Sequence, residues 1–307
     1  MNGGAATMTE TAMAGSLPSR ERVGFSPGRV GVIAANTLTE AVRQKVFNFF
    51  LIVGLVFIAS ASFFAQFTFG EQMKFIKDTC LGVISVISTL IAIVGTAQLL
   101  PSEVENRTIY TILAKPVRRF EFLLGKFLGS LLLLGISVAA MCLLFVAVLF
   151  IKEQGMLREL RQQFTAGLPA AEVTDLDQQI QQVAKEAFDV NLAKAVLADF
   201  AKATLVAAIT LLISTFSTSL VFNVIVPFMI FVAGMLRGSA VELWGGHPLL
   251  MALLAVVPDF GLFSLADEIN LGNVVPWSHI GEIIVYGLGR TLIIVVAAHL
   301  IFSRREI

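Results

Sequence analysis

The sequence predicts an all-α membrane protein with six transmembrane helices and with both chain ends in the cytosol. Two observations lead to this fold class. Apolar residues make up 56% of the 307 residues and charged residues only 14%, against about 25% charged residues in an average soluble domain. The apolar residues also fall into long runs, and a membrane-spanning helix needs about 20 of them. We therefore expect a multi-pass protein of the cell membrane, because a soluble enzyme of this size needs more polar surface.

The charge balance and the positions of the cysteines limit which partners and ligands we expect. The chain has 22 basic and 22 acidic residues, so it lacks the basic excess of a nucleic-acid-binding protein. Neither cysteine has a second Cys or a His at metal-ligand spacing. We therefore expect neither a nucleic-acid partner nor a bound metal.

The chain opens with residues 1–28, which are rich in Gly, Ala, Ser, Thr and Pro without any period. We expect a disordered arm there, followed by one transmembrane domain over residues 29–307. Apolar residues between Val30 and Val42 fall near one helical face, which predicts an interfacial helix in the headgroup layer. This helix either anchors the chain or also contacts a cytosolic partner.

Six apolar runs of the chain predict transmembrane spans. They cover residues 47–67, 80–100, 122–151, 200–217, 220–236 and 280–302. A seventh run, 249–257, is too short to span and is followed by Pro258, so we expect a re-entrant or interfacial piece. With the N-terminus inside, 12 basic residues lie on the cytosolic side and 9 on the outer side. The positive-inside rule then predicts that both termini are cytosolic.

The largest outer segment covers residues 152–199. Apolar residues recur there at helical spacing, before and after a break at Gly167 and Pro169. This pattern predicts a helical hairpin outside the membrane. The hairpin is either a solvated spacer or a docking arm for an outer partner.

A short cytosolic segment between the second and third spans carries the most specific pattern. Ser102 and Glu105 form a capping box at its start. Ile109, Ile112 and Leu113 share one helical face, with charged residues opposite, and Pro116 ends the helix. The segment therefore predicts an amphipathic helix on the cytosolic surface, where a soluble partner could press on it.

This segment resembles the ABC-2 type transporter permease family. The matching residues are Glu103, Glu105, Arg107, Thr108, Leu113, Pro116, Val117, Arg119, Gly125 and Lys126. Arg118 departs from the pattern, since serine is common there. Residues 36–43 before the first span resemble the branch of the family that includes the copper-enzyme maturation permeases.

The resemblance implies a dimer of permeases, either two copies or two related chains, each bound to a separate cytosolic ATP-binding subunit. It makes the segment 101–120 a coupling helix seated in that ATPase, and the complex an exporter. The expected ATPase-coupling residues are Glu103, Glu105, Arg107, Thr108, Leu113, Pro116, Arg118, Arg119 and Lys126. ATP and Mg²⁺ would then be bound by the partner subunit.

We expect no cofactor and no enzyme activity on this chain. Gly125-Lys126 is followed by Phe127, where a phosphate-binding loop needs Ser or Thr, and no Gly lies five residues earlier. Gly125 with Gly129, and Gly234 with Gly238, instead have the GxxxG spacing that is typical of helix packing in membranes.

Polar residues in the spans are the candidates for a transport path or a gate. Ser85, Ser88, Thr89 and Thr96 make a small polar stripe, which serves either helix packing or a path. Arg290 lies well inside the last span, where an unpaired charge is costly. We expect it to pair with Glu282 or Asp259, as a structural ion pair or as part of a gate or anion site.

Two other functions remain open besides a permease subunit. One is a non-transporting membrane subunit for assembly or signalling, which docks a partner through residues 152–199. The other is a secondary transporter, which is disfavoured because Arg290 is the one firm charge that we expect in the spans.

Overall fold

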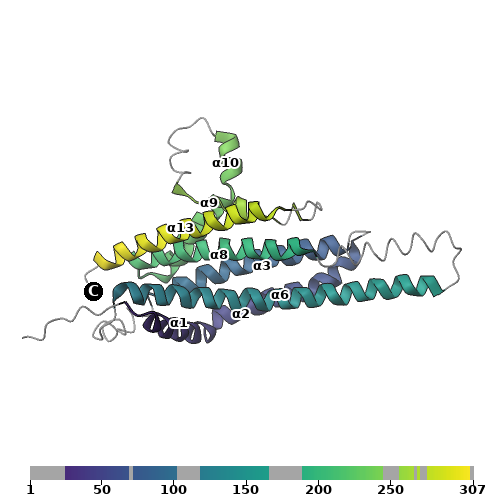
Figure 1. Cartoon of the computed structure of the whole chain (residues 1–307), viewed down its shortest axis with the longest axis horizontal. Helices are drawn as coiled ribbons and strands as arrows, with labels where there is room; N and C mark the ends of the chain where they lie inside the picture. The colour runs from purple at the N-terminus through teal and green to yellow at the C-terminus, as the bar shows by residue number, and fades with distance from the viewer. Residues whose placement is uncertain are drawn as a thin grey trace, which may run out of the picture.

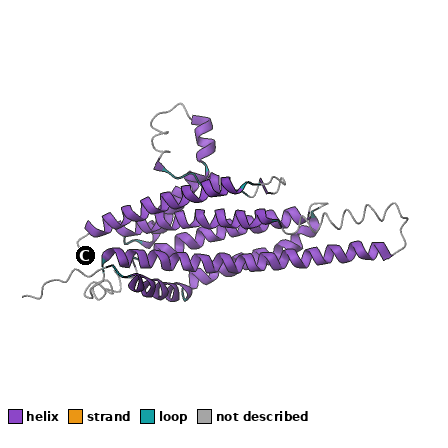
Figure 2. Cartoon of the chain, in the orientation of Figure 1, coloured by secondary structure: helices purple, strands orange, loops and turns teal. Residues whose placement is uncertain are grey.

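The computed structural model describes residues 25–68, 72–101, 118–165, 189–244, 256–265, 268–269 and 275–304. The regular structure of this part of the chain is helical (Figure 2), which confirms the predicted fold class. Its elements are α1 (Pro27–Val42), α2 (Lys45–Phe64), η1 (Ala65–Phe67), α3 (Gln72–Ala97), α6 (Arg119–Thr165), α8 (Val190–Phe216), α9 (Leu220–Met235), α10 (Arg237–Trp244), η2 (Gly261–Phe263) and α13 (Trp277–Arg304).

The long helices lie side by side in an elongated bundle (Figure 1), and α8 is at its centre. In the most apolar stretch of α8, 78% of the residues are buried, against 22% for α2 and 28% for α13. Small residues explain this position, because they let α3, α6 and α13 approach α8 closely. The buried alanines of α8 are Ala195, Ala198, Ala201, Ala203, Ala207 and Ala208.

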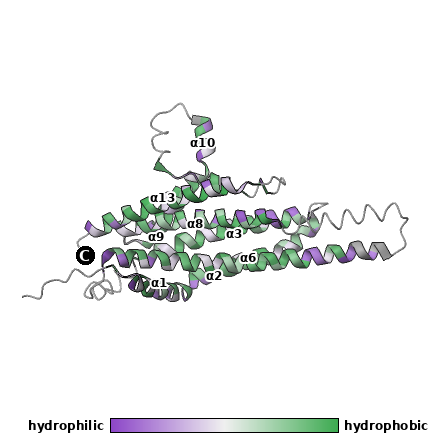
Figure 3. Ribbon diagram, in the orientation of Figure 1, coloured by the Kyte–Doolittle hydropathy of each residue, from purple (hydrophilic) through white to green (hydrophobic). Residues whose placement is uncertain are grey.

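The outer faces of the bundle are apolar along most of its length (Figure 3). Large side chains such as Phe49, Leu143 and Val285 are 61%, 74% and 72% exposed. Such a surface is unfavourable in water and suits lipid. Among the described residues, α2 with η1, α3, α6, α8 and α13 are each long and apolar enough to cross a membrane.

The sixth predicted span, 220–236, is a broken element. Helix α9 has 16 residues, a length of about 24 Å, whereas the hydrocarbon core is about 30 Å thick. The chain then bends by 55° into α10, which stands away from the bundle in Figure 1. The count is therefore five continuous helices, or six spans if α9 and α10 are counted together.

The bend also separates the two glycines of the second GxxxG pattern. Gly234 lies in α9 and is tightly packed, since an added Cβ would lie 2.5 Å from the carbonyl oxygen of Pro258. Gly238 lies in α10, where an added Cβ would meet no described atom within 4 Å. The two residues therefore do not form one packing face.

Both ends of the described chain lie at one end of the bundle. The backbone N–H of Ser26, just before α1, donates to Glu121 at the start of α6. Arg119, beside it, donates to the carbonyl oxygen of Ser303 near the end of α13. That this end faces the cytosol stays a prediction from the charge distribution.

A buried lysine joins α8 and α13 at the opposite end. Lys194 Nζ donates to Asn191 Oδ1 at 2.8 Å and to the carbonyl oxygen of Val275 at 2.7 Å. It also lies 4.9 Å from the ring centroid of Trp277. These contacts fix the start of α13 against the start of α8.

One predicted boundary changes in the structure. Residues 1–24 of the predicted arm lie outside the described residues, but α1 begins at Pro27, within that arm. The apolar pattern after residue 151 predicts that the third helix continues beyond the membrane, and this prediction is confirmed. Helix α6 has 47 residues, is about 70 Å long and ends at Thr165, just before Gly167. The remainder of the predicted outer hairpin, 166–188, lies outside the described residues.

Helix α1 lies against the beginning of α6 at the two glycines of the first GxxxG pattern. A Cβ added to Gly125 would lie 2.7 Å from Ile33 Cβ, and one added to Gly129 would lie 2.5 Å from Thr37 Cβ. Val30, Ala34, Thr37 and Ala41 are the buried face of α1. The missing side chains of α6 therefore make room for this face.

We predict that Gly129→Ala destabilises the contact between α1 and α6. The new Cβ would also meet the backbone oxygen of Ala34 at 2.8 Å, and overpacking of this kind costs about 1–3 kcal/mol. Gly135→Ala in the same helix is the control, because its Cβ would meet Phe200 at an ordinary 3.8 Å. The measurement is the midpoint of SDS-induced unfolding, together with amide exchange in α1. Equal behaviour of the two variants would contradict the close packing.

Candidate functional site

A buried carboxylate, Glu121, joins the first turns of two helices at the candidate cytosolic end. Its side chain is fully buried. Its Oε1 accepts the Ser26 N–H at 2.8 Å and lies 3.4 Å from the Arg29 guanidinium, while its Oε2 accepts the Arg118 N–H at 3.3 Å. Ser26 precedes α1 and Arg118 precedes α6. Both helix N-termini therefore direct N–H donors and positive dipole ends at one anion.

Arg119, the first residue of α6, connects this helix to the last turn of α13. Its Nη1 donates to the carbonyl oxygens of Ser303 at 3.0 Å and Phe302 at 3.4 Å. Carbonyls at a helix C-terminus lack partners within the helix, and a cation there is favourable. The rings of Phe122 and Phe302 stack beside this contact, 6.3 Å apart.

Lys126, about two turns beyond Arg119 in α6, contacts α1. Its Nζ lies 3.5 Å from Glu40 Oε2, and its side chain is 2% exposed. It also lies 5.9 Å from the ring centroid of Phe122. The predicted coupling residues Arg118, Arg119 and Lys126 thus come together where α1, α6 and α13 meet, and we call this cluster with Glu121 the cytosolic joint.

The other predicted coupling residues fall in the segment between α3 and the cytosolic joint, which lies outside the described residues. They are Glu103, Glu105, Arg107, Thr108, Leu113 and Pro116. Their roles stay predictions from the sequence.

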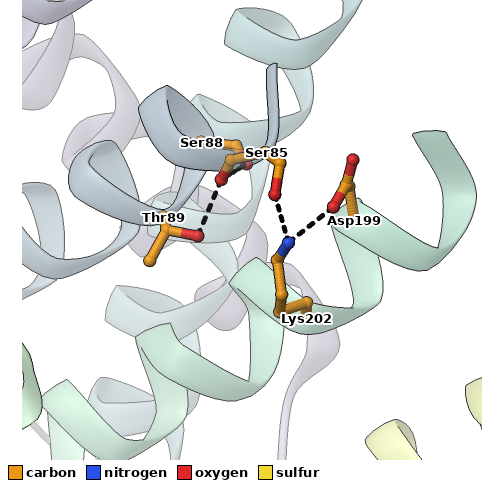
Figure 4. A network of polar contacts seen from close by, with 5 residues as sticks. All are labelled: Ser85, Ser88, Thr89, Asp199 and Lys202. Carbon is orange, nitrogen blue, oxygen red and sulfur yellow. Dashed lines mark hydrogen bonds and ion pairs between the residues drawn. The ribbon is translucent and has the colours of Figure 1, made fainter. Parts of the chain in front are cut away.

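The predicted polar stripe of α3 faces a charged pair on α8 (Figure 4). Lys202 Nζ lies 2.6 Å from Asp199 Oδ1 and also donates to Ser85 Oγ. The side chains of Lys202 and Asp199 are 2% and 8% exposed. We call these three residues the α3–α8 ion-pair cluster. Because each charge has a close partner, the cluster avoids the cost of an isolated charge in a low-dielectric interior.

The remaining hydroxyls of the stripe have more local partners. Ser88 and Thr89 donate to the carbonyl oxygen of Ser85 at 3.1 and 2.8 Å, within α3. Thr96 is buried, and its hydroxyl has no hydrogen-bond partner among the described residues.

Arg290, the charge predicted in the last span, lies against an aromatic ring. Its guanidinium carbon is 5.6 Å from the ring centroid of Tyr286, one turn away on α13. The two carboxylates expected as its partners are engaged elsewhere. Glu282 lies 3.9 Å from His279, and Asp259 Oδ1 accepts the Gly261 N–H at 3.0 Å. No ion pair to Arg290 occurs within the described ranges.

Three charged residues of these clusters were not expected as site residues from the sequence. Asp199 and Lys202 lie within the continuous helix α8, so the expectation of a single firm charge in the spans is wrong. Their spacing of three residues, which puts both on one helical face, is the signal that indicates a pair. Glu121 is indicated by its place in the first turn of α6, where a carboxylate can bond back to the preceding N–H.

These features define a class of protein, a multi-pass helical membrane protein with charged clusters inside its bundle and at one end of it. Residues 30–307 match the family model described as ABC-2 family transporter protein. The chain therefore belongs to the ABC-2 transporter family and is a membrane-spanning permease subunit of an ABC transporter. A search of curated proteins finds no match to it. The branch of copper-enzyme maturation permeases stays a prediction.

Family membership identifies where the chain works and the kind of complex to which it belongs. It is a transport component of the cell membrane, and the family works with a cytosolic ABC-type ATPase. The cytosolic joint and the α3–α8 ion-pair cluster are thus parts of a permease.

We predict that breaking the α3–α8 ion-pair cluster on one side costs more than removing both charges. Asp199→Asn leaves the Lys202 ammonium buried without a carboxylate, which costs about 3–5 kcal/mol in a protein interior. The double variant Asp199→Leu, Lys202→Met removes both charges and should be closer to the parent protein. The measurement is unfolding in mixed micelles. A double variant no more stable than Asp199→Asn would contradict the ion pair.

Proposed function

We propose that the chain is the permease half of an ATP-driven exporter, working as a dimer with two cytosolic ATP-binding subunits. The segment 101–120 is the coupling element that receives the motion of the ATPase. The export direction is inferred from the family resemblance, whereas the coupling role is also supported by contacts of the described residues.

The observation that carries the proposal is the cytosolic joint. The segment 101–120 ends at residues whose backbone and side chains are bonded to three helices. The Arg118 N–H and Arg119 guanidinium attach it to Glu121 of α6 and to the last turn of α13. Through Glu121 it also reaches Ser26 and Arg29 at the start of α1.

Such a joint gives a displacement of the segment a direct route into the membrane domain. A push on Arg118 and Arg119 acts on α6 and α13 at their cytosolic ends. These helices flank the central α8, and interior packing is too dense to absorb the motion locally. A loop that served only to set membrane topology would not need a fully buried carboxylate at its end.

The structure also bears on the secondary-transporter alternative. The charges of Asp199 and Lys202 in α8 are compensated by each other, with Ser85 as a further partner of Lys202. Ion-coupled transporters use ionisable groups in the membrane as relays. A mutually paired Lys and Asp is better explained as a structural cluster, so the ATP-driven function remains our proposal.

We predict that Glu121→Gln uncouples the permease from the ATPase while the complex still assembles. The amide keeps the size of the side chain but loses the charge that binds Arg29 and the two N-termini. We expect permease-dependent ATP hydrolysis to fall roughly tenfold, which corresponds to about 1.4 kcal/mol, and amide exchange at residues 26–34 to rise. Glu153→Gln, at the far end of α6, is the matched control. Parent-like hydrolysis in Glu121→Gln would contradict the coupling role.

We further predict that charge reversal at Glu105 weakens binding of the ATPase without affecting membrane insertion. Glu105→Lys changes a residue expected on the cytosolic surface, so the insertion signals of the spans stay intact. Arg119→Glu should weaken binding too, and should also loosen α13, since Arg119 bonds its last carbonyls. The measurement is co-purification of the ATPase at native salt. Full retention in both variants would refute the interface.

A further inference from the structure

The last helix, α13, carries polar residues on one face from its outer end to its middle. His279, Glu282, Tyr286 and Arg290 follow one another at spacings of three or four residues, so they share a face. We call them the α13 stripe. His279 and Glu282 side chains are 41% and 79% exposed, while Tyr286 and Arg290 are half-buried. A face in contact with lipid alone would be apolar along this length.

Arg290 is the innermost member of the α13 stripe and lies at the middle of the helix. It is 13 residues from Trp277 (290 − 277) and 14 from Arg304 (304 − 290), or about 20 Å from either end. An extended arginine side chain is too short to reach the headgroups from this depth, so snorkelling does not remove the cost of placing its charge in the membrane interior. The guanidinium needs a partner at the level of the membrane interior.

Within the described ranges the protein supplies a ring to Arg290 but no acceptor. The guanidinium lies over Tyr286, and no hydrogen bond or ion pair to it is formed by the described residues. Guanidinium groups carry five N–H donors in a planar fork that suits carboxylate and phosphate oxygens. The Tyr286 ring lies beside this fork and does not use its N–H donors as a hydrogen-bond acceptor would.

Irregular backbone contacts α13 about one turn before Arg290. The Tyr286 hydroxyl accepts the Asp259 N–H at 3.0 Å, and Gly287 packs on the ring of Phe263. This loop passes between α9 and α13, and Gly261, Leu262 and Ser264 are exposed. Non-helical backbone occurs at membrane depth only when protein buries it or when it lines a water-filled cavity. Its exposed residues therefore indicate water on this side of α13.

Arginines lie on both sides of the loop. Arg237 Nη1 donates to the carbonyl oxygen of Val257, and Arg290 lies on the side of α13. Asp259, a carboxylate of the loop, accepts the N–H of Gly261 within the loop itself. Ile293, three residues further along α13 and on the same side of the helix as Arg290, is 66% exposed.

We propose that the α13 stripe lines the outer half of the transport path and that Arg290, beside the Tyr286 ring, binds the anionic head of an amphiphile. The fork binds the head, and the apolar surface around Ile293 accepts the chain. This inference rests on the proposed transport function and specifies the chemical class of its ligand. A transported amphiphile and a resident anionic lipid share this chemistry.

The test is photolabelling of the complex in phosphatidylcholine nanodiscs, without ATP. The probe is dodecyl phosphate with a diazirine in its chain, and the corresponding alcohol is its neutral match. We expect the phosphate, and not the alcohol, to label residues close to Arg290 on α13. Arg290→Gln should reduce this labelling roughly tenfold, the effect of losing a hydrogen bond to a charged group.

Two further variants separate the role of Arg290 from folding. Arg290→Lys keeps the charge and should retain part of the labelling. Arg304→Gln makes the same change at the cytosolic end of the helix and should label like the parent protein. Equal labelling by phosphate and alcohol, or full labelling of Arg290→Gln, would overturn the site. The site would also be overturned if neither probe labels the protein and Gly289→Cys forms disulfides efficiently between copies. A second copy of the chain would then cover this face.

ATP turnover distinguishes the two sources of the ligand. Labelling that falls while ATP is hydrolysed identifies a transported amphiphile, and labelling that stays constant identifies a resident lipid. Both results support binding at Arg290. Labelling is measured without ATP, so it stays intact even if Glu121→Gln shows that the coupling proposal is wrong. Conversely, if Arg290 does not bind the probe, ATP hydrolysis should still depend on the permease.

Discussion

The contacts of the buried Glu121 carboxylate hold together the end of this permease where α1, α6 and α13 meet. It lies where the N-termini of α1 and α6 converge and accepts an N–H from the residue before each helix. A fully buried anion is costly unless donors and opposite charge surround it. Here two backbone donors, two helix dipoles and the Arg29 guanidinium supply that compensation. The same carboxylate therefore fixes α1 on α6 and determines where the chain emerges from the segment 101–120.

The packing of the bundle extends from this point. Gly125 and Gly129 let α1 approach α6 because they carry no Cβ at the contact. The alanines of α8 allow α3, α6 and α13 to pack around one central helix. Without a hydrophobic driving force between helices in lipid, close contact of this kind is a main source of association. The ion pair of Asp199 and Lys202 is tolerated at the centre because Ser85 of α3 completes its partners.

The cytosolic joint and the α13 stripe differ in how their charged groups are compensated. At the cytosolic joint, Glu121 and Lys126 are buried and the charged groups bond to neighbouring helices, which suits the transmission of movement between elements. On the α13 stripe, by contrast, Arg290 has an aromatic support but no described acceptor. The broken helix α9 and the loop before η2 reach the same level of the bundle. Irregular backbone and an unsatisfied guanidinium are both costly in contact with lipid. Beside water they are tolerated, and there they can take part in transport.

The sequence by itself determined the class of protein, the approximate places of the spans and the family. Hydropathy and helical period are properties of single segments, so α2, α3, α6, α8 and α13 all lie where apolar runs predict them. Only the tertiary structure decided which polar groups meet. Ser26 and Glu121 are 95 residues apart, and Ser85 and Lys202 are 117 apart. Such contacts depend on how helices are arranged around α8, which no local pattern encodes. The bend after α9 could not be predicted for the same reason. The run 220–236 is apolar apart from Asn223, and the bend follows Gly234, which packs against Pro258 and Phe260.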